Sequence, residues 1–360
     1  MNHFLGRTSE TTIKLRTLSD CMCRVGNEVT QKLSNITAQT LRMYGFDKES
    51  GLPGEDVTLA ETVTSVSESS NIEIDEQKII TAMDAVNQSR EEKIPIPVEE
   101  VKIESTPSEC IYISIDDIGV KHQKDFRKEG SVREYKFVEN TVAYIQYADK
   151  SCVLTGIGMQ NVFKSVLAFL LANNLLSHEL VFLTDGAKDI KGYIDSIFQF
   201  HPYSVILDWY HLKKRCQERL SQSIRGKDKR NVVLEKLLRY LWVGDVSGGT
   251  TFLTHLKPEE IKSQKWLDDL LGYLARKSYA IPCYAVRAKL GLKNSSHAVE
   301  KANDILIAQR QKHNGMAWSP NGSSALASLQ MIYLNNQQDL WFRKKELLFC
   351  DFFKNVKKAA

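Results

Sequence analysis

The chain has 360 residues, 42% of them hydrophobic, 26% charged and 9% aromatic, which is the balance of a globular protein with room for two or three domains. This length and composition exclude a disulfide-stabilised miniprotein, a collagen-like chain and a disordered one. The longest apolar run, 165–172, is far shorter than the roughly 20 residues of a membrane-spanning helix. The first residues lack an apolar signal core, so we expect a cytoplasmic protein.

The net charge of +4 is unevenly distributed along the chain. Residues 1–106 hold 11 Lys/Arg and 18 Asp/Glu, a net of −7, whereas the remainder holds 37 and 26, a net of +11. A basic bulk behind an acidic front favours a polyanionic partner such as nucleic acid. The alternative is an enzyme whose basic surface serves no specific partner.

Seven cysteines, at positions 21, 23, 110, 152, 216, 283 and 350, are scattered and form no CxxC pair. An odd, dispersed set in a cytoplasmic chain predicts reduced thiols. We expect neither disulfides nor a zinc site.

The front of the chain predicts a small helical region over residues 1–50. Leu18, Met22, Val25, Val29 and Leu33 follow helical spacing there. Residues 51–107 are acidic, rich in Ser and Thr and poor in aromatics, which predicts a linker or loosely packed arm.

A mixed α/β core is predicted from 108 onward. Its first part, 108–211, contains β-rich runs at 110–120, 141–148 and 152–158, which predict an antiparallel meander. A helix at 160–176, a strand at 179–186, a helix at 188–200 and a strand at 203–210 follow in the sequence. This order predicts an α/β fold of the RNase H-like kind, with a mixed sheet and flanking helices.

The second half of the chain is mainly helical in pattern. Residues 212–292 predict an all-helical insertion, and 293–345 return to the core with a helix over 296–313 that carries Glu300. Helical signal continues from 325 to 353, and 346–360 are assigned as a C-terminal tail.

Three acidic sites fall where this fold places chemistry: Asp116 or its neighbour Asp117 on the first strand, Asp185 at the end of the fourth, and Glu300 on the late helix. Carboxylates gathered in one cleft need a cation, and oxygen ligands favour Mg²⁺ or Mn²⁺. Two such ions support phosphodiester displacement. Each acid also has a plain structural explanation: a helix-capping turn for Asp185, a solvated strand end for Asp116 beside Asp117, and an exposed helix position for Glu300.

A further cluster, Asp208-Trp-Tyr-His211, lies where the fifth strand meets the insertion. A carboxylate three residues before an imidazole can orient the ring or help to bind a cation, although a structural pair explains it equally. A basic run follows, typical of phosphate contacts or of a solvated helix face. It contains Lys213, Lys214, Arg215, Arg219, Arg225, Lys227, Lys229 and Arg230.

The stretches ISIDDIGV, FLTDGAKDI, ILDWYHL and SSHAVEKANDILIAQRQKHNGMAWSPNGSSALASL, in this order, carry a family resemblance. The acids are spaced by 69 residues from Asp116 to Asp185 and by 115 from Asp185 to Glu300. Over 108–345 the chain resembles the bacterial insertion-sequence transposases of DDE type, of the Mutator-related kind with an all-helical insert before the catalytic Glu.

The resemblance implies that Asp116, Asp185 and Glu300 are catalytic and hold two Mg²⁺ or Mn²⁺ ions. It also makes Asp208 and His211 accessory to the site, and Asn303 lies one helical turn after Glu300. Residues expected to contact DNA are Lys213, Lys214, Arg215, Arg219, Lys301, Arg310, Lys312, His313 and Trp318. Trp318 either stacks on a distorted base or belongs to the core.

Family members cut at transposon ends and join the 3′-hydroxyl to target DNA. The resemblance therefore implies DNA partners, namely the terminal inverted repeats and the target, a homodimer or higher synaptic assembly, and a place at the bacterial nucleoid. The front of the chain lacks the longer DNA-binding region of many relatives. Two alternatives follow: an inactive or truncated DNA-binding derivative, or an RNase H-like nuclease of other specificity.

Overall fold

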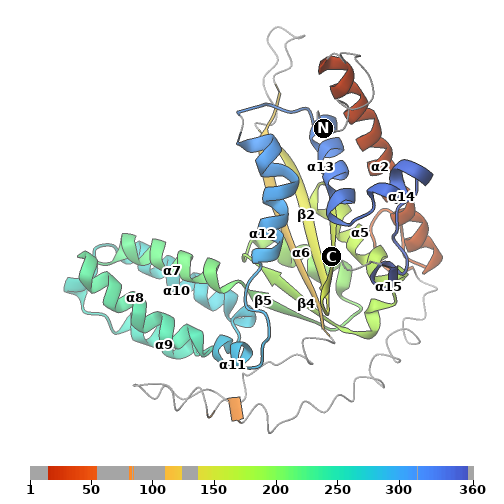
Figure 1. Ribbon diagram of the computed structural model, residues 1–360. Helices are drawn as coiled ribbons and strands as arrows, with labels where there is room; N and C mark the ends of the chain where they lie inside the picture. The colour runs from red at the N-terminus through yellow and green to blue at the C-terminus, as the bar shows by residue number, and fades with distance from the viewer. Residues whose placement is uncertain are drawn as a thin grey trace.

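The computed structural model describes residues 15–54, 81, 82, 84, 110–123, 137–313 and 315–355. Most of the predicted linker, 51–107, lies outside this part. A five-stranded mixed sheet forms the centre of the molecule (Figure 1). Its strands are β1 (Cys110–Lys121), β2 (Phe137–Tyr147), β3 (Lys150–Ile157), β4 (Glu179–Thr184) and β5 (Tyr203–Leu207).

The strand order is β3-β2-β1-β4-β5. β1, β2 and β3 pair antiparallel as a meander, whereas β1 pairs parallel with β4, and β4 with β5. The parallel strands are joined by helical crossovers, as parallel pairing requires. The predicted RNase H-like sheet with flanking helices is confirmed.

Alternate residues of β1 point into two different hydrophobic cores. Ile111, Ile113 and Ile115 belong to the main core, together with the crossover helices α5 (Met159–Ala172) and α6 (Lys188–Phe198). A short 3₁₀ turn, Leu175–Ser177, leads from α5 to β4. Tyr112 faces the opposite way, into a second core.

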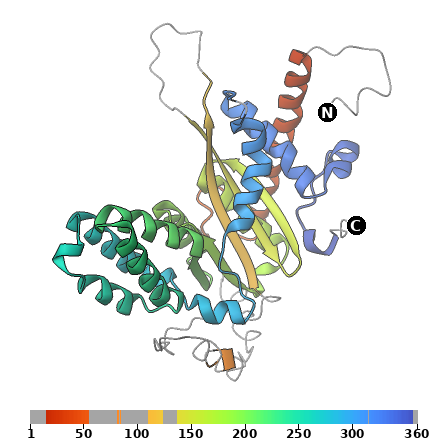
Figure 2. The same ribbon diagram turned by 60° about the vertical axis from the view of Figure 1, so that its left-hand side comes forward.

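The second core joins the sheet to the helical insertion. Val181, Leu183 and Leu207 of the parallel strands pack there against buried leucines of the insertion. Its helices are α7 (Trp209–Ser223), α8 (Lys227–Trp242), α9 (Val246–Thr254), α10 (Gln264–Lys277) and α11 (Tyr284–Lys289), with 3₁₀ turns at Pro258–Glu260 and Ser278–Ala280. Figures 1 and 2 show the insertion as a lobe beside the β5 side of the sheet.

The chain then returns to the sheet through α12 (His297–Asn303), which contacts β1 and β2. A π-helix, η5 (Asp304–Lys312), continues it directly. α13 (Pro320–Leu334) and α14 (Gln338–Lys344) follow.

The N-terminal helix α2 (Leu15–Met43) is packed into the main core rather than forming a separate unit. It lies along α13, and Gly26 allows the close approach because a Cβ there would come within 2.2 Å of the Ala325 carbonyl oxygen. Thr30 and Ser328 hydrogen bond across the same contact, at 2.8 Å.

Two predicted boundaries need correction. The strand predicted over 203–210 ends at Leu207, because the Asp208 carboxylate caps α7 and Trp209 already begins that helix. The predicted tail, 346–360, contributes to the core: Phe349, Phe352 and Phe353 are buried against Phe169, and α15 (Phe352–Asn355) carries two of them.

None of the seven cysteines is joined to another in the structure. None of the helices in the described ranges is both long and apolar enough to cross a membrane.

Candidate active site

Three aspartates lie in a row across the carboxyl ends of the parallel strands. Ser114 pairs with Leu183 and Thr184 pairs with Leu207. Continuing both registers places Asp116, Asp185 and Asp208 side by side on the face that looks toward α12 and the insertion. In an open sheet this end of the parallel strands is the usual place for a ligand site.

Asp116 is held by an amide from α12. Asn303 Nδ2 donates a hydrogen bond of 2.7 Å to Asp116 Oδ2. Burial, and then the neighbouring charge of Asp185, raise the pKa of Asp116 to about 6, although the Asn303 hydrogen bond opposes the shift. Asp116 and Asp185 are therefore close enough for their charges to repel.

Asp117 points to the other side of β1. Its carboxylate accepts a hydrogen bond from the Thr141 hydroxyl on β2, and burial raises its pKa despite that bond. Because α12 contacts Asp116 through Asn303, the geometry favours Asp116 as the residue that faces Glu300.

Asp185 is half-buried and stands in a tight turn. Its Oδ1 accepts a hydrogen bond of 2.8 Å from the Ala187 backbone N–H, and Gly186 takes a φ of +87° that favours glycine. Ala187, rather than Asp185, occupies the cap position of α6. The turn therefore presents the carboxylate at the strand end, and its second oxygen has no hydrogen bond to the described residues.

Glu300 is linked to the row of aspartates by His211, whose ring lies between Glu300 and Asp208. His211 Nε2 lies 3.5 Å from Glu300 Oε1, and His211 Nδ1 lies 3.3 Å from Asp208 Oδ1, an ion-pair contact rather than an aligned hydrogen bond. The pairing with Asp208 raises the pKa of His211; burial opposes this, and Glu300 and Asp185 add to it. Stability from this charged pairing is present below pH 6.5 and is lost as the pH rises through the raised pKa.

Asp208 is almost fully buried, with 1% of its surface exposed, and it accepts hydrogen bonds from two segments of the site. The Ser296 backbone N–H and hydroxyl donate to Oδ2 at 2.6 and 3.1 Å, and the His211 backbone N–H donates to Oδ1 at 2.9 Å. Burial by itself would raise the pKa of Asp208, but these hydrogen bonds and the His211 ring outweigh it and lower the pKa. Asp208 thus ties the start of α7 to the start of α12.

Ser296 is a site residue that sequence reasoning missed. It occupies the N-cap position of α12, yet its donors serve Asp208 of another segment rather than its own helix. A Ser-Ser-His sequence ahead of a helical pattern signals a cap. No sequence signal identifies a partner 88 residues away.

The donor chemistry of this site fits a hard divalent cation. Asp116 and Asp185 supply oxygen ligands. Burial, and then the charge of Asp185, raise the pKa of Asp116, and a cation bound between the two carboxylates would favour their charged forms. Within the described ranges, however, no three His, Cys, Asp or Glu side chains are already grouped around one metal position. Glu300, held at His211, would have to move toward the two aspartates to complete a shared set.

Lys213 and Lys214 are exposed on α7, directly after His211. Arg215 and Arg219 of the basic run instead contact aromatic rings inside the insertion. Arg215 lies over the Tyr273 ring at 5.6 Å. Arg219 pairs with Asp269 at 2.7 Å and stacks on Trp266 at 4.7 Å, so it joins α7 to α10.

The expected DNA-contacting residues after Glu300 differ in exposure and in their partners. Lys301, Arg310 and Lys312 are exposed on α12 and η5. The exposed His313 ring lies 3.5 Å from Asp304. Trp318 is half-buried against the main core, and its backbone pairs with the end of β1, so its position matches the core alternative.

Comparisons with known proteins add little to this geometry. No family model matches the chain, and no curated protein matches its sequence. Among solved structures, the Drosophila P element transposase strand transfer complex shows weak structural similarity. The alignment has 10% identity and a TM-score of 0.24, and covers 98% of this chain and 85% of that one.

Proposed function

We propose that this chain is a DDE-type transposase that cleaves DNA at the ends of its element and transfers the strand into target DNA. The observation that carries the proposal is the row of Asp116, Asp185 and Asp208 at one end of an RNase H-like sheet, with Glu300 brought to it by His211. The family resemblance of its motifs supports assignment to the Mutator-related bacterial insertion sequences.

In this proposal Asp116, Asp185 and Glu300 hold two Mg²⁺ or Mn²⁺ ions. Such ions activate a water or 3′-hydroxyl and stabilise the leaving oxygen. Asn303 orients Asp116 through its hydrogen bond, and His211 holds Glu300 at the edge of the site. Asp208 positions His211 in turn, so these three act on the ligands rather than on the DNA.

The proposed partners are the terminal inverted repeats and target DNA, bound in a homodimer or higher synaptic assembly. Lys213, Lys214, Lys301, Arg310 and Lys312 are exposed on α7, α12 and η5, and they suit phosphate contacts. Two of these helices, α7 and α12, also carry His211, Glu300 and Asn303 of the site. Arg219, which pairs with Asp269, and the half-buried Trp318 are not among the proposed DNA contacts.

The test is metal-dependent nicking of labelled DNA that carries the flanks of the gene. We expect cleavage at a defined flank with Mg²⁺ or Mn²⁺, lost in Asp116→Asn, Asp185→Asn and Glu300→Gln, and reduced about 10- to 100-fold in His211→Ala. Asp228→Asn, an exposed acid on α8, is the matched control and retains activity.

Tight flank binding without cleavage by the wild type would contradict the enzymatic proposal and indicate a DNA-binding derivative. Cleavage of branched or hybrid nucleic acid in preference to the flanks would indicate a nuclease of other specificity.

A further inference from the structure

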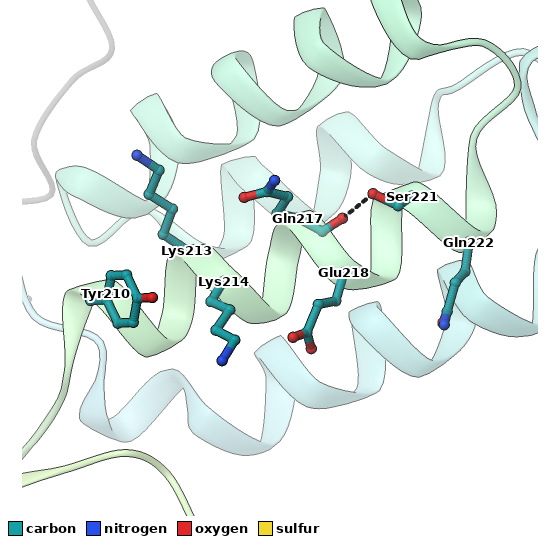
Figure 3. A pocket seen from close by; sticks show the side chains of 7 residues that line it. All are labelled: Tyr210, Lys213, Lys214, Gln217, Glu218, Ser221 and Gln222. Atoms are coloured by element: carbon teal, nitrogen blue, oxygen red, sulfur yellow. Dashed lines mark hydrogen bonds between the residues drawn. The ribbon is translucent and has the colours of Figure 1, made fainter. Parts of the chain in front are cut away.

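One exposed face of α7 forms a shallow pocket of about 680 Å³ that begins at Tyr210, next to His211 of the site. Its residues follow helical spacing along the whole helix, as Figure 3 shows. They are Tyr210, Lys213, Lys214, Gln217, Glu218, Ser221 and Gln222. The buried stripe of the same helix, Leu212, Cys216 and Leu220, faces the second core.

Tyr210 stands at the end of this face nearest the site. Its side chain is 59% exposed, although most aromatic rings of the insertion are packed. The neighbouring residue is His211, whose ring lies 5.6 Å away, edge to face. Tyr210 therefore offers a free aromatic surface immediately next to the group that holds Glu300.

The charge of the face suits phosphates. Neither Lys213 nor Lys214 lies within ion-pair distance of a carboxylate in the described part of the chain. Glu218, the one acid lining the pocket, lies 4.0 Å from Arg215, which offsets its charge. Gln217 and Gln222 contribute neutral amides between and beyond the charges.

We propose that this face of α7 binds the DNA strand that leads away from the cleaved phosphate. Tyr210 stacks on an unpaired base next to the site, and Lys213 and Lys214 contact the following phosphates. From Tyr210 to Gln222 the helix rises about 18 Å, which spans roughly five nucleotides of one strand. The inference rests on the proposed function for the identity of the ligand.

Tyr210 is tested by DNA binding in EDTA, where no metal-dependent chemistry occurs. The probes are a fluorescent duplex of the gene flank and the same duplex with a short unpaired segment. We expect Tyr210→Ala to weaken binding of the partly unpaired probe about tenfold, with little change for the paired one. Tyr210→Phe retains the ring and the affinity. Tyr333→Ala, at a similarly exposed tyrosine on α13, leaves the binding of both probes unchanged.

The lysines are tested by the salt dependence of the same binding. Removing two phosphate contacts should reduce the slope of log K against log salt by about 2 in Lys213→Ala/Lys214→Ala. The control is Lys227→Ala/Lys229→Ala, two exposed lysines at the start of α8 outside the pocket, which should leave the slope unchanged.

Equal affinities of Tyr210→Ala and wild type for the unpaired probe would overturn the inference, as would failure of the wild type to bind either probe. A polyglutamate peptide that binds this face as tightly as the DNA would overturn it in favour of a protein partner. Because the assay contains no metal, its outcome is independent of cleavage. Binding that behaves as expected while the nicking assay shows no cleavage would support DNA binding by this face and contradict only the proposed cleavage.

Discussion

At the scale of single residues, burial and a neighbouring carboxylate together disfavour the charged form of Asp116. Burial and the charge of Asp185 raise the pKa of Asp116 to about 6, and the hydrogen bond from Asn303 opposes this rise only in part. An acid with a raised folded-state pKa binds protons more readily in the folded than in the unfolded chain. Folding stability therefore falls as the pH rises from about 4 through 6, and the loss persists at neutral pH.

Asp116→Asn should remove this penalty while keeping an oxygen for the Asn303 hydrogen bond. We expect the variant to be more stable than wild type by about 1–2 kcal/mol at pH 7.5, a gain that vanishes near pH 4. Mg²⁺ should stabilise the wild type at pH 7.5 and not the variant. Urea unfolding at several pH values measures both effects, with Asp228→Asn as the control. A variant less stable than wild type at every pH would contradict the account.

At the scale of elements, one contact of the N-terminal helix is unusually close. α2 and α13 meet where Gly26 faces the backbone of Ala325, from segments almost 300 residues apart in the sequence. Glycine normally weakens a helix, so its presence within α2 is explained by this packing rather than by helix propensity.

Gly26→Ala should destabilise the protein by about 1–3 kcal/mol, because the new methyl group overlaps the Ala325 backbone. Gly192→Ala in α6 is the matched control. Outside the neighbouring backbone of its own helix, no atom of the described residues lies within 4 Å of the added Cβ, so helix propensity should stabilise the protein by about 0.5–1 kcal/mol. Thermal unfolding followed by circular dichroism compares the two. Equal effects of both substitutions would show that the α2–α13 contact is looser than described.

At the scale of the whole molecule, the helical insertion and the sheet share a core. Tyr112, Val181 and Leu183 of the sheet pack with Leu220 and Leu237 of the insertion. The insertion is a lobe in outline (Figure 2) but is joined to the sheet by continuous apolar packing. We therefore expect both to unfold in one cooperative transition.

Leu220→Ala should lower the free energy of unfolding by about 2–5 kcal/mol, because this side chain is fully buried. Val232→Ala, at a position 66% exposed on α8, should change it by less than about 0.5 kcal/mol. Hydrogen exchange should report the same loss for amides of α7 and of β1. Loss confined to the insertion would mean that the two parts unfold separately.

The sequence by itself determined the elements and much of the fold. β-branched runs predicted the meander, and the alternation of strands and helices predicted the RNase H-like order, because periodicity and β-propensity are local properties. The apolar run that ends in Asp185 also placed that acid at a strand end. The end of the strand at Leu207 was harder to predict from the sequence, because Trp209 and Tyr210 suit a strand as well as a helix. The capping of α7 by Asp208 decides that both belong to the helix.

Only the tertiary structure decided which side chains meet. Strand alternation places Asp116 and Asp117 on opposite faces of the sheet. Which of these faces α12 covers depends on tertiary packing, and the hydrogen bond from Asn303 of α12 to Asp116 identifies the face of Asp116. Likewise, Arg219 and Trp318 resemble DNA-binding residues in the sequence, and long-range partners engage both of them. The pairing of Asp208 with Ser296 joins residues 88 apart, and such contacts depend on how whole elements pack, which no local pattern encodes.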